Sequence, residues 1–293
     1  MSMQYDLNNN EEYEQSYDSN ETTTVRNSRN VNITAPIGFS FSRTFKNGSF
    51  WLASGLILSL LTFIFMTISI IPQLVALNST GAAEASAAIM QLFLNGIMMI
   101  VMIPISIILL RQGLREVGAI DNDYQTVLPE KTPAQWGTLF KDIAWGKVIL
   151  TTIIVIAITG ILGGLIGGLF GALAATVSGS STGGLLIFLL GLVVYLGLLA
   201  LIVMLQFSVY FAADTENNKR LTATQCVKAS WKAVSKNFWK VVGFDILLGL
   251  VNFVLIVFTL GVGMIVAIPV SILAQTHMYK QISGQYAPIK QAV

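Results

Sequence analysis

The chain has 293 residues, of which 54% are hydrophobic and only 11% are charged. Soluble domains have roughly 25% charged residues, so this chain holds more apolar surface than a water-soluble core can bury. Its net charge of +2 gives no reason to expect a nucleic-acid partner. With one cysteine, Cys226, and one histidine, His277, it lacks the residues for an intramolecular disulfide or a zinc or copper cluster, and we expect no metal and no cofactor.

The first 35 residues are polar, acidic and rich in asparagine, and they show no hydrophobic periodicity. This composition is typical of disorder, and it lacks the basic start and early apolar core of a cleavable signal peptide. We therefore expect a disordered tail over 1–35, a single membrane domain over 36–284, and a short C-terminal tail over 285–293.

Four long stretches without charged residues follow the tail, at 47–83, 85–110, 148–213 and 246–279. Each is longer than the ~20 residues that a helix needs to cross a bilayer. The third is too long for one crossing, and the Ser, Thr and Gly residues at 176–184 supply a reversal. The last stretch, extended back to Val241, is divided by a turn at 259–263. The sequence thus predicts an all-α membrane bundle with six transmembrane helices, at 51–77, 88–110, 148–173, 185–212, 241–258 and 262–279.

The distribution of cations supports six crossings. All 17 Lys and Arg residues lie before the first span, after the last span, or in 111–147 and 214–240, whereas 78–87, 174–184 and 259–261 contain none. Basic and cation-free segments therefore alternate, as the positive-inside rule requires when both termini are cytoplasmic. A five-helix alternative would place Lys280 and Lys290 on the side opposite to the other cations.

The chain also contains an internal repeat. Residues 99–107 read MIVMIPISI and residues 264–272 read MIVAIPVSI, a match at seven of nine positions. The segment 45–51 before the first span resembles 235–239 before the fifth, and a fainter copy begins at Trp136. We expect three helix-pair repeats in parallel orientation. Pro104 and Pro269 should kink the returning helices, either to pack them or to line a cavity.

A basic segment precedes the fifth span. Lysines at intervals of four, from Lys228 to Lys240, predict one cationic helical face, beside a stripe that contains Trp231 and Val234. Such an interfacial amphipathic helix suits anionic lipid headgroups, or it serves only as a topology anchor. The candidate lipid-interface residues are Lys228, Trp231, Lys232, Lys236, Trp239 and Lys240.

Two further groups of residues lie within the predicted spans. The polar ones are a candidate internal path, although interhelical hydrogen bonds explain the same residues and are the interpretation that we favour. Asp245 is the one acidic residue among them. The glycines form two strips on the third span, which predict close packing at the bundle centre or at a subunit contact. The polar group is Asn95, Gln206, Asp245, Asn252 and His277, and the glycines are Gly160, Gly163, Gly164, Gly167, Gly168 and Gly171.

The order Ala229-Ser230-Trp231-Lys232-Ala233-Val234, Asn237-Phe238-Trp239 and a late Ile268-Pro269 resembles an uncharacterised family of bacterial inner-membrane proteins with six helices and unknown function. The resemblance covers roughly 36–284, and it implies a multi-pass protein of the bacterial cytoplasmic membrane. The segment more distantly resembles the membrane domain of some glycerophosphoryl diester phosphodiesterases, but their soluble catalytic barrel has no counterpart in this chain.

No catalytic constellation is visible within the predicted spans, so we expect no enzymatic activity. The first functional hypothesis is a non-enzymatic membrane protein that acts through contacts with anionic membrane lipids, with protein partners or with further copies of itself. The alternative is a small-molecule or ion transporter or channel, which the repeated proline-containing helices and Asp245 favour.

Overall fold

The computed structural model of the protein describes residues 31–77, 82–120, 127–128, 134–176, 181–215 and 218–283. Most of the expected N-terminal tail and all of the expected C-terminal tail lie outside these residues. The described residues from Asn32 onward belong to one compact unit. This unit begins a few residues before Pro36, where the sequence places the start of the domain.

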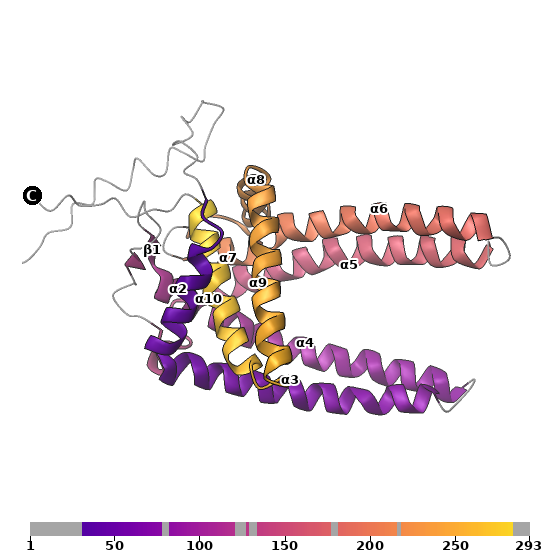
Figure 1. Ribbon diagram of the computed structural model, residues 1–293, viewed down its shortest axis with the longest axis horizontal. Coiled ribbons are helices and arrows are strands. Elements are labelled where there is room, and N and C mark those ends of the chain that lie inside the picture. The colour runs from indigo at the N-terminus through magenta and orange to yellow at the C-terminus, as the bar shows by residue number, and fades with distance from the viewer. Residues whose placement is uncertain are drawn as a thin grey trace, which may run out of the picture. The chain divides into compact units, whose positions relative to one another are not determined.

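Among the described residues the fold is all-α, apart from a two-residue antiparallel pair formed by β1 (Ala119–Ile120) and β2 (Val127–Leu128). Long helices follow one another in pairs that contact each other and lie side by side in Figure 1. The pairs are α3 (Gly48–Leu77) with α4 (Ala82–Val117), α5 (Trp145–Thr176) with α6 (Ser181–Leu205), and α9 (Phe238–Phe258) with α10 (Met264–Ile282).

A short element precedes each pair. These elements are α2 (Ala35–Lys46), the 3-10 helix η2 (Trp136–Thr138) and α8 (Ala223–Ser235). Asn47 and Asn237, which the sequence aligns, occupy the same place before α3 and α9. The carbonyl of each accepts the backbone N–H groups three and four residues later, and so starts the long helix.

Five helical segments are long and apolar enough to cross a membrane, at 48–77, 85–117, 145–173, 187–213 and 238–258. The chain therefore has the structure of a multi-pass membrane protein. Large hydrophobic side chains on these segments are exposed in great number, as expected of helices whose solvent is lipid. The fourth segment is interrupted, since α6 ends at Leu205 and a short helix, α7 (Ser208–Ala213), follows. The predicted turn at 259–263 is confirmed, with Leu260 and Gly261 at positive φ.

The sixth predicted span forms α10, which is not among these five segments. This helix contacts α2, α3, α4 and α9, and residues 276–282 are all buried. Polar side chains such as His277 and Lys280 lower its hydropathy, and they are enclosed by protein. The central helix of the packed unit is therefore α10.

The prediction that the glycine-rich third span lies at the bundle centre is wrong. A Cβ added at Gly160, Gly164, Gly167, Gly168 or Gly171 would meet nothing within 4 Å, and only Gly163 faces a neighbour, Leu198 of α6. No close approach of a neighbouring helix within the described part of the chain therefore requires these glycines. A contact with another copy of the chain remains a prediction.

The repeated prolines lie inside α4 and α10, and both helices continue through them. A proline displaces the carbonyl four residues earlier, which for Pro269 is that of Ile265. That carbonyl lies against Gly55 of α3, where an added Cβ would overlap its oxygen and come within 3.1 Å of Pro269 Cδ. The absence of a side chain at Gly55 thus allows α3 and α10 to pack around the proline. The kinks themselves stay predictions.

Candidate functional site

The candidate lipid-interface residues surround the junction of α8 and α9. A capping box between Thr222 and Gln225 fixes the start of α8, and α9 begins at Phe238, two residues after Lys236 caps the end of α8. Trp231 is 47% exposed and Trp239, in the first turn of a membrane-spanning segment, is 80% exposed. We call the six residues the α8–α9 joint: Lys228, Trp231, Lys232, Lys236, Trp239 and Lys240.

The structure corrects the expected continuous cationic face. The helix breaks at 236–237, so Lys228 and Lys232 belong to α8 whereas Lys240 belongs to α9. Val234, expected in the apolar stripe that faces lipid, is fully buried in protein. The inner face of α8, which packs near α5, α6 and α7, is made of small residues, and the lysines and Trp231 point away from it. The joint thus presents its cations and indoles on the outer side of the fold.

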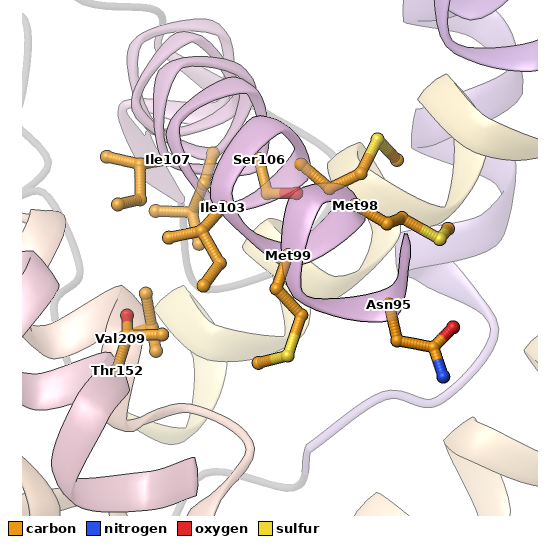
Figure 2. A pocket seen from close by; sticks show the side chains of 10 residues that line it. Asn95, Met98, Met99, Ile103, Ser106, Ile107, Thr152 and Val209 are labelled. Carbon is orange, nitrogen blue, oxygen red and sulfur yellow. The ribbon is translucent and has the colours of Figure 1, made fainter. Parts of the chain in front are cut away.

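Two cavities lie among the membrane-spanning helices. The first, which we call the α4 cavity, has a volume of about 460 Å³ and lies between α4 and the α5–α7 region. Figure 2 shows Met99, Ile103 and Ile107 of α4 on one side and Thr152 and Val209 on the other. Its surface is almost entirely apolar.

The second cavity, which we call the α10 cavity, has a volume of about 470 Å³ and is lined by α3, α4, α7, α9 and α10. It holds more polar groups. Asn252 donates from Nδ2 to Ser271 Oγ at 2.8 Å, and the Tyr210 hydroxyl donates to Gln275 Oε1 at 2.8 Å. Met102, Ser106 and Leu110 line both cavities, so the two are adjacent along one side of α4.

The lining of the cavities follows the sequence repeat. Eight residues of α4 line the α4 cavity, and six of them follow at spacings of three, one, three, one and three: Met99, Met102, Ile103, Ser106, Ile107 and Leu110. The residues at the equivalent places of the second copy, or three residues beyond it, line the α10 cavity: Met264, Ala267, Ile268, Ser271, Ile272 and Gln275. The two matching segments, 99–107 and 264–272, therefore give the same helical face to a cavity.

The predicted intramembrane polar residues do not converge on one path. The Gln206 amide donates to Asp245 Oδ2 at 3.0 Å, and Asn252 bonds to Ser271 across the α9–α10 pair. Asn95 lines the α4 cavity and accepts from Gln91 one turn earlier on α4. His277 is fully buried, with Nδ1 3.0 Å from the Gln281 amide nitrogen and its ring 5.1 Å from that of Phe39. Each is held by a neighbour of its own.

A buried ionic network, which the sequence analysis missed, joins the ends of α7 and α10. Asp214, 1% exposed, accepts from Lys280 Nζ at 2.9 Å and from the Tyr279 hydroxyl at 3.1 Å. Asn218 donates to the Tyr279 hydroxyl, and Lys147 of α5 donates to the Asn218 carbonyl at 2.7 Å. The network fastens the two long pairs α5–α6 and α9–α10 to each other through the segment after α7.

A second network holds the end of α4. Glu116 pairs with Arg43 of α2 at 3.5 Å and accepts the backbone N–H of Ala134. Arg115 pairs with Asp142 at 2.7 Å. The helical continuation from Arg111 to Val117, which the sequence places outside the second span, is wholly buried. Charges that look cytoplasmic in the sequence are thus structural.

Cys226 lies on the buried face of α8. Burial raises the pKa of its thiol, because the thiolate would lose its hydration, while the charge of Lys147 and a backbone hydrogen bond act in the opposite direction. Such a thiol packs as a small apolar group and is a poor nucleophile.

Among the residues that the structure describes, no group of three His, Cys, Asp or Glu side chains is placed to hold a metal ion. Comparison of the chain with models of protein families, with curated proteins and with solved structures gave no match. Function is therefore argued from the α8–α9 joint and the two cavities.

Proposed function

We propose that the protein is a non-enzymatic, multi-pass membrane protein that acts through contacts with anionic lipids at the α8–α9 joint. The observation that carries this proposal is the placement of two exposed tryptophans, Trp231 and Trp239, among four lysines at the start of a membrane-spanning helix. Indole rings favour the boundary between headgroups and acyl chains, and lysines at that depth reach lipid phosphates.

The packing of α8 supports this orientation of the joint. Its small-residue face is buried in protein, so the lysine face is the one left for another partner. Each lysine near an anionic leaflet contributes on the order of 1 kcal/mol of attraction, and salt screens this contribution. Three or four lysines together would enrich anionic lipid strongly at low ionic strength.

The test compares two triple variants of the full-length protein that lose the same charge. Lys228, Lys232 and Lys236 are replaced by Gln in the first variant, and Lys46, Lys141 and Lys219, which are also exposed, are replaced by Gln in the matched control. Each protein is reconstituted in nanodiscs of neutral and anionic phospholipid, and the lipids retained on gentle detergent extraction are counted by native mass spectrometry.

We expect the joint variant to lose most of its retained anionic lipid, and the control to keep it. The difference should shrink at high salt, because the contribution is electrostatic. An equal loss of anionic lipid in both variants would mean that net charge alone retains the lipid, and it would contradict a specific role of the joint. Retention of the lipid in both variants would also contradict the proposal.

For the topology we propose six crossings, with α10 as the last and both termini in the cytoplasm of a bacterial cell. The alternation of basic and cation-free segments supports this count. The enclosure of α10 by α2, α3, α4 and α9 explains how a helix of lower hydropathy can lie at membrane depth. A reporter fused after Val293 that is active only in the cytoplasm tests it; activity on the far side would leave five crossings.

We also propose that the three pairs arose as repeats of one helix-pair unit. The common position of Asn47 and Asn237, and the common cavity-lining face of 99–107 and 264–272, support this relation. The resemblance to the six-helix inner-membrane family, and the more distant one to the membrane domain of the phosphodiesterases, remain expectations, as do protein partners or self-association.

A transporter or channel is the second proposal, favoured by Asp245 inside a membrane-spanning segment. Asp245 lines neither described cavity and is held by Gln206, which makes this function the weaker candidate. Solute or proton flux in proteoliposomes that is lost in Asp245→Asn would favour it over the lipid-contact function.

A further inference from the structure

We propose that the two cavities together form one binding site for a neutral amphiphile with a hydroxyl head, whose alkyl chain occupies the α4 cavity and whose head lies in the α10 cavity. This site is separate from the α8–α9 joint and uses none of its lysines.

Size and continuity make a single site of the two cavities. Each volume, about 460 and about 470 Å³, falls within the ~300–1,000 Å³ of ligand pockets. Three residues of α4 line both, with Ser106 between the apolar side chains of Met102 and Leu110. A ligand that extends along α4 therefore passes Ser106 on its way from one cavity to the other.

The chemistry of the lining selects the class of ligand. Among the described residues that line the cavities there is no Lys, Arg, Asp or Glu, so nothing there compensates the buried charge of an anionic or cationic head. The α4 cavity, with Met98, Met99 and Ile103, suits a flexible alkyl chain, because methionine side chains adapt to irregular apolar shapes. The chain end of the ligand thus belongs in the α4 cavity.

Polar groups accumulate at the other end. Where the α4 face has Leu110, the equivalent place of the α10 face has Gln275, and Asn252 and Ser271 line the same cavity. Ser106 is exposed to both cavities and makes no hydrogen bond to another described residue. A hydroxyl head can donate to and accept from serine hydroxyls, so Ser106 and Ser271, the equivalent serines of the repeat, are its expected partners.

The experiment uses three photoactivatable, alkyne-tagged probes with the same sixteen-carbon chain length, about that of a membrane lipid tail: an alcohol, its methyl ether and the corresponding carboxylic acid. The full-length protein in neutral nanodiscs is labelled with each, with and without excess untagged alcohol, and the labelled peptides are identified by mass spectrometry.

We expect the alcohol to label peptides from α4, α5 and α7, and untagged alcohol to compete. The ether, which cannot donate a hydrogen bond, should label about 5-fold less, as the loss of one hydrogen bond implies. Ser106→Ala should remove most of that difference, whereas Ser69→Ala, a serine of α3 that lines neither cavity, should leave it. Met99→Trp, which fills the α4 cavity, should reduce labelling by all three probes.

Equal labelling by alcohol and ether in the unaltered protein would overturn the proposal, because the cavities would then bind the alkyl chain without recognising the hydroxyl head. Stronger labelling by the acid would also overturn it, in favour of an anionic ligand. The three probes are compared on the unaltered protein, so this test does not require any variant to fold. Replacement of the joint lysines should leave all three results unchanged, so failure of the proposed lipid contact and failure of this site are distinguishable.

Discussion

Two regions of this protein differ in the interactions that they make: the cation-rich ends of the helices form buried ion pairs, whereas the long apolar helix pairs expose hydrophobic side chains. At the end of α4 and α10, charged side chains such as Glu116 and Lys280 are buried and paired with partners from other elements. Along α5 and α6, large hydrophobic side chains are exposed and the glycines of α5 have open space beside them. The ends fix the relative positions of the helices by directional bonds, and the pairs leave their apolar surface to the bilayer.

The largest effect should come from breaking the buried pair of Asp214 and Lys280. Asp214→Asn or Lys280→Met leaves one charge buried without its partner, and we expect a loss of about 3–5 kcal/mol in the free energy of unfolding. The measurement is reversible unfolding in mixed micelles with increasing SDS. The double variant should recover part of the loss; if it does not, the pair is not the source of the effect.

Gly55→Ala tests the close approach of α3 to α10. The added methyl group overlaps the Ile265 carbonyl, and we expect a loss of about 1–3 kcal/mol in the free energy of unfolding from the forced separation of the helices. Gly96→Ala on α4 is the control, because its Cβ meets nothing within 4 Å. A Gly55→Ala protein as stable as the control would show that α3 and α10 do not pack around Pro269.

The glycines of α5 test the apolar part of this comparison, namely that α5 is loosely packed within the chain. Because its glycines have open space, the triple variant Gly160→Ala, Gly164→Ala, Gly168→Ala should not lower the free energy of unfolding of the monomer, and higher helix propensity should raise it slightly. Size-exclusion chromatography with light scattering then reports whether self-association changes. A clear loss of monomer stability would mean that α5 packs more closely within the chain than the structure has it.

Cys226 gives the smallest expected effect on stability. Because burial raises the pKa of its thiol, Cys226 stays protonated in the folded protein when the pH passes about 8.5, the pKa of a cysteine in the unfolded chain. The small stabilisation from this group is therefore present below that pH and is lost as the pH rises through the folded pKa. Alkylation by a maleimide should be slow in the folded protein. The control is Cys226→Ser with Ser235→Cys, an exposed position of α8, which should react rapidly.

Periodicity and charge predicted much of the fold. The turn at 259–263 and the membrane-spanning character of five segments follow from local sequence signals, and the structure has them; the first and fifth helices begin three residues earlier than predicted, at Gly48 and Phe238. The burial of Arg115 and Glu116 could not be read in the same way, because hydropathy treats every charge as facing water and pairing is known only once α2 and the segment after Ala134 are in place.

The site was predicted in part. The repeat 99–107 and 264–272 was visible, but its alignment with two cavities depends on which neighbours surround α4 and α10. The lysine run was assigned to one helix, whereas local capping ends α8 near Lys236, so a spacing of four residues does not guarantee a shared face. We predicted α5 at the bundle centre because glycine favours close packing. The structure has α10 there instead, with small and polar residues among its buried side chains.

The first and last described parts of the packed unit are joined directly. The backbone N–H of Asn32 donates to Gln281 Oε1 at 2.8 Å, and the Gln281 amide donates back to the Asn32 carbonyl across 249 residues of sequence. During synthesis, the faces of α2 and α3 that contact α10 therefore stay uncovered until α10 has left the ribosome. A nascent chain that stops before Met264 lacks α10, so these faces have no helix to pack against.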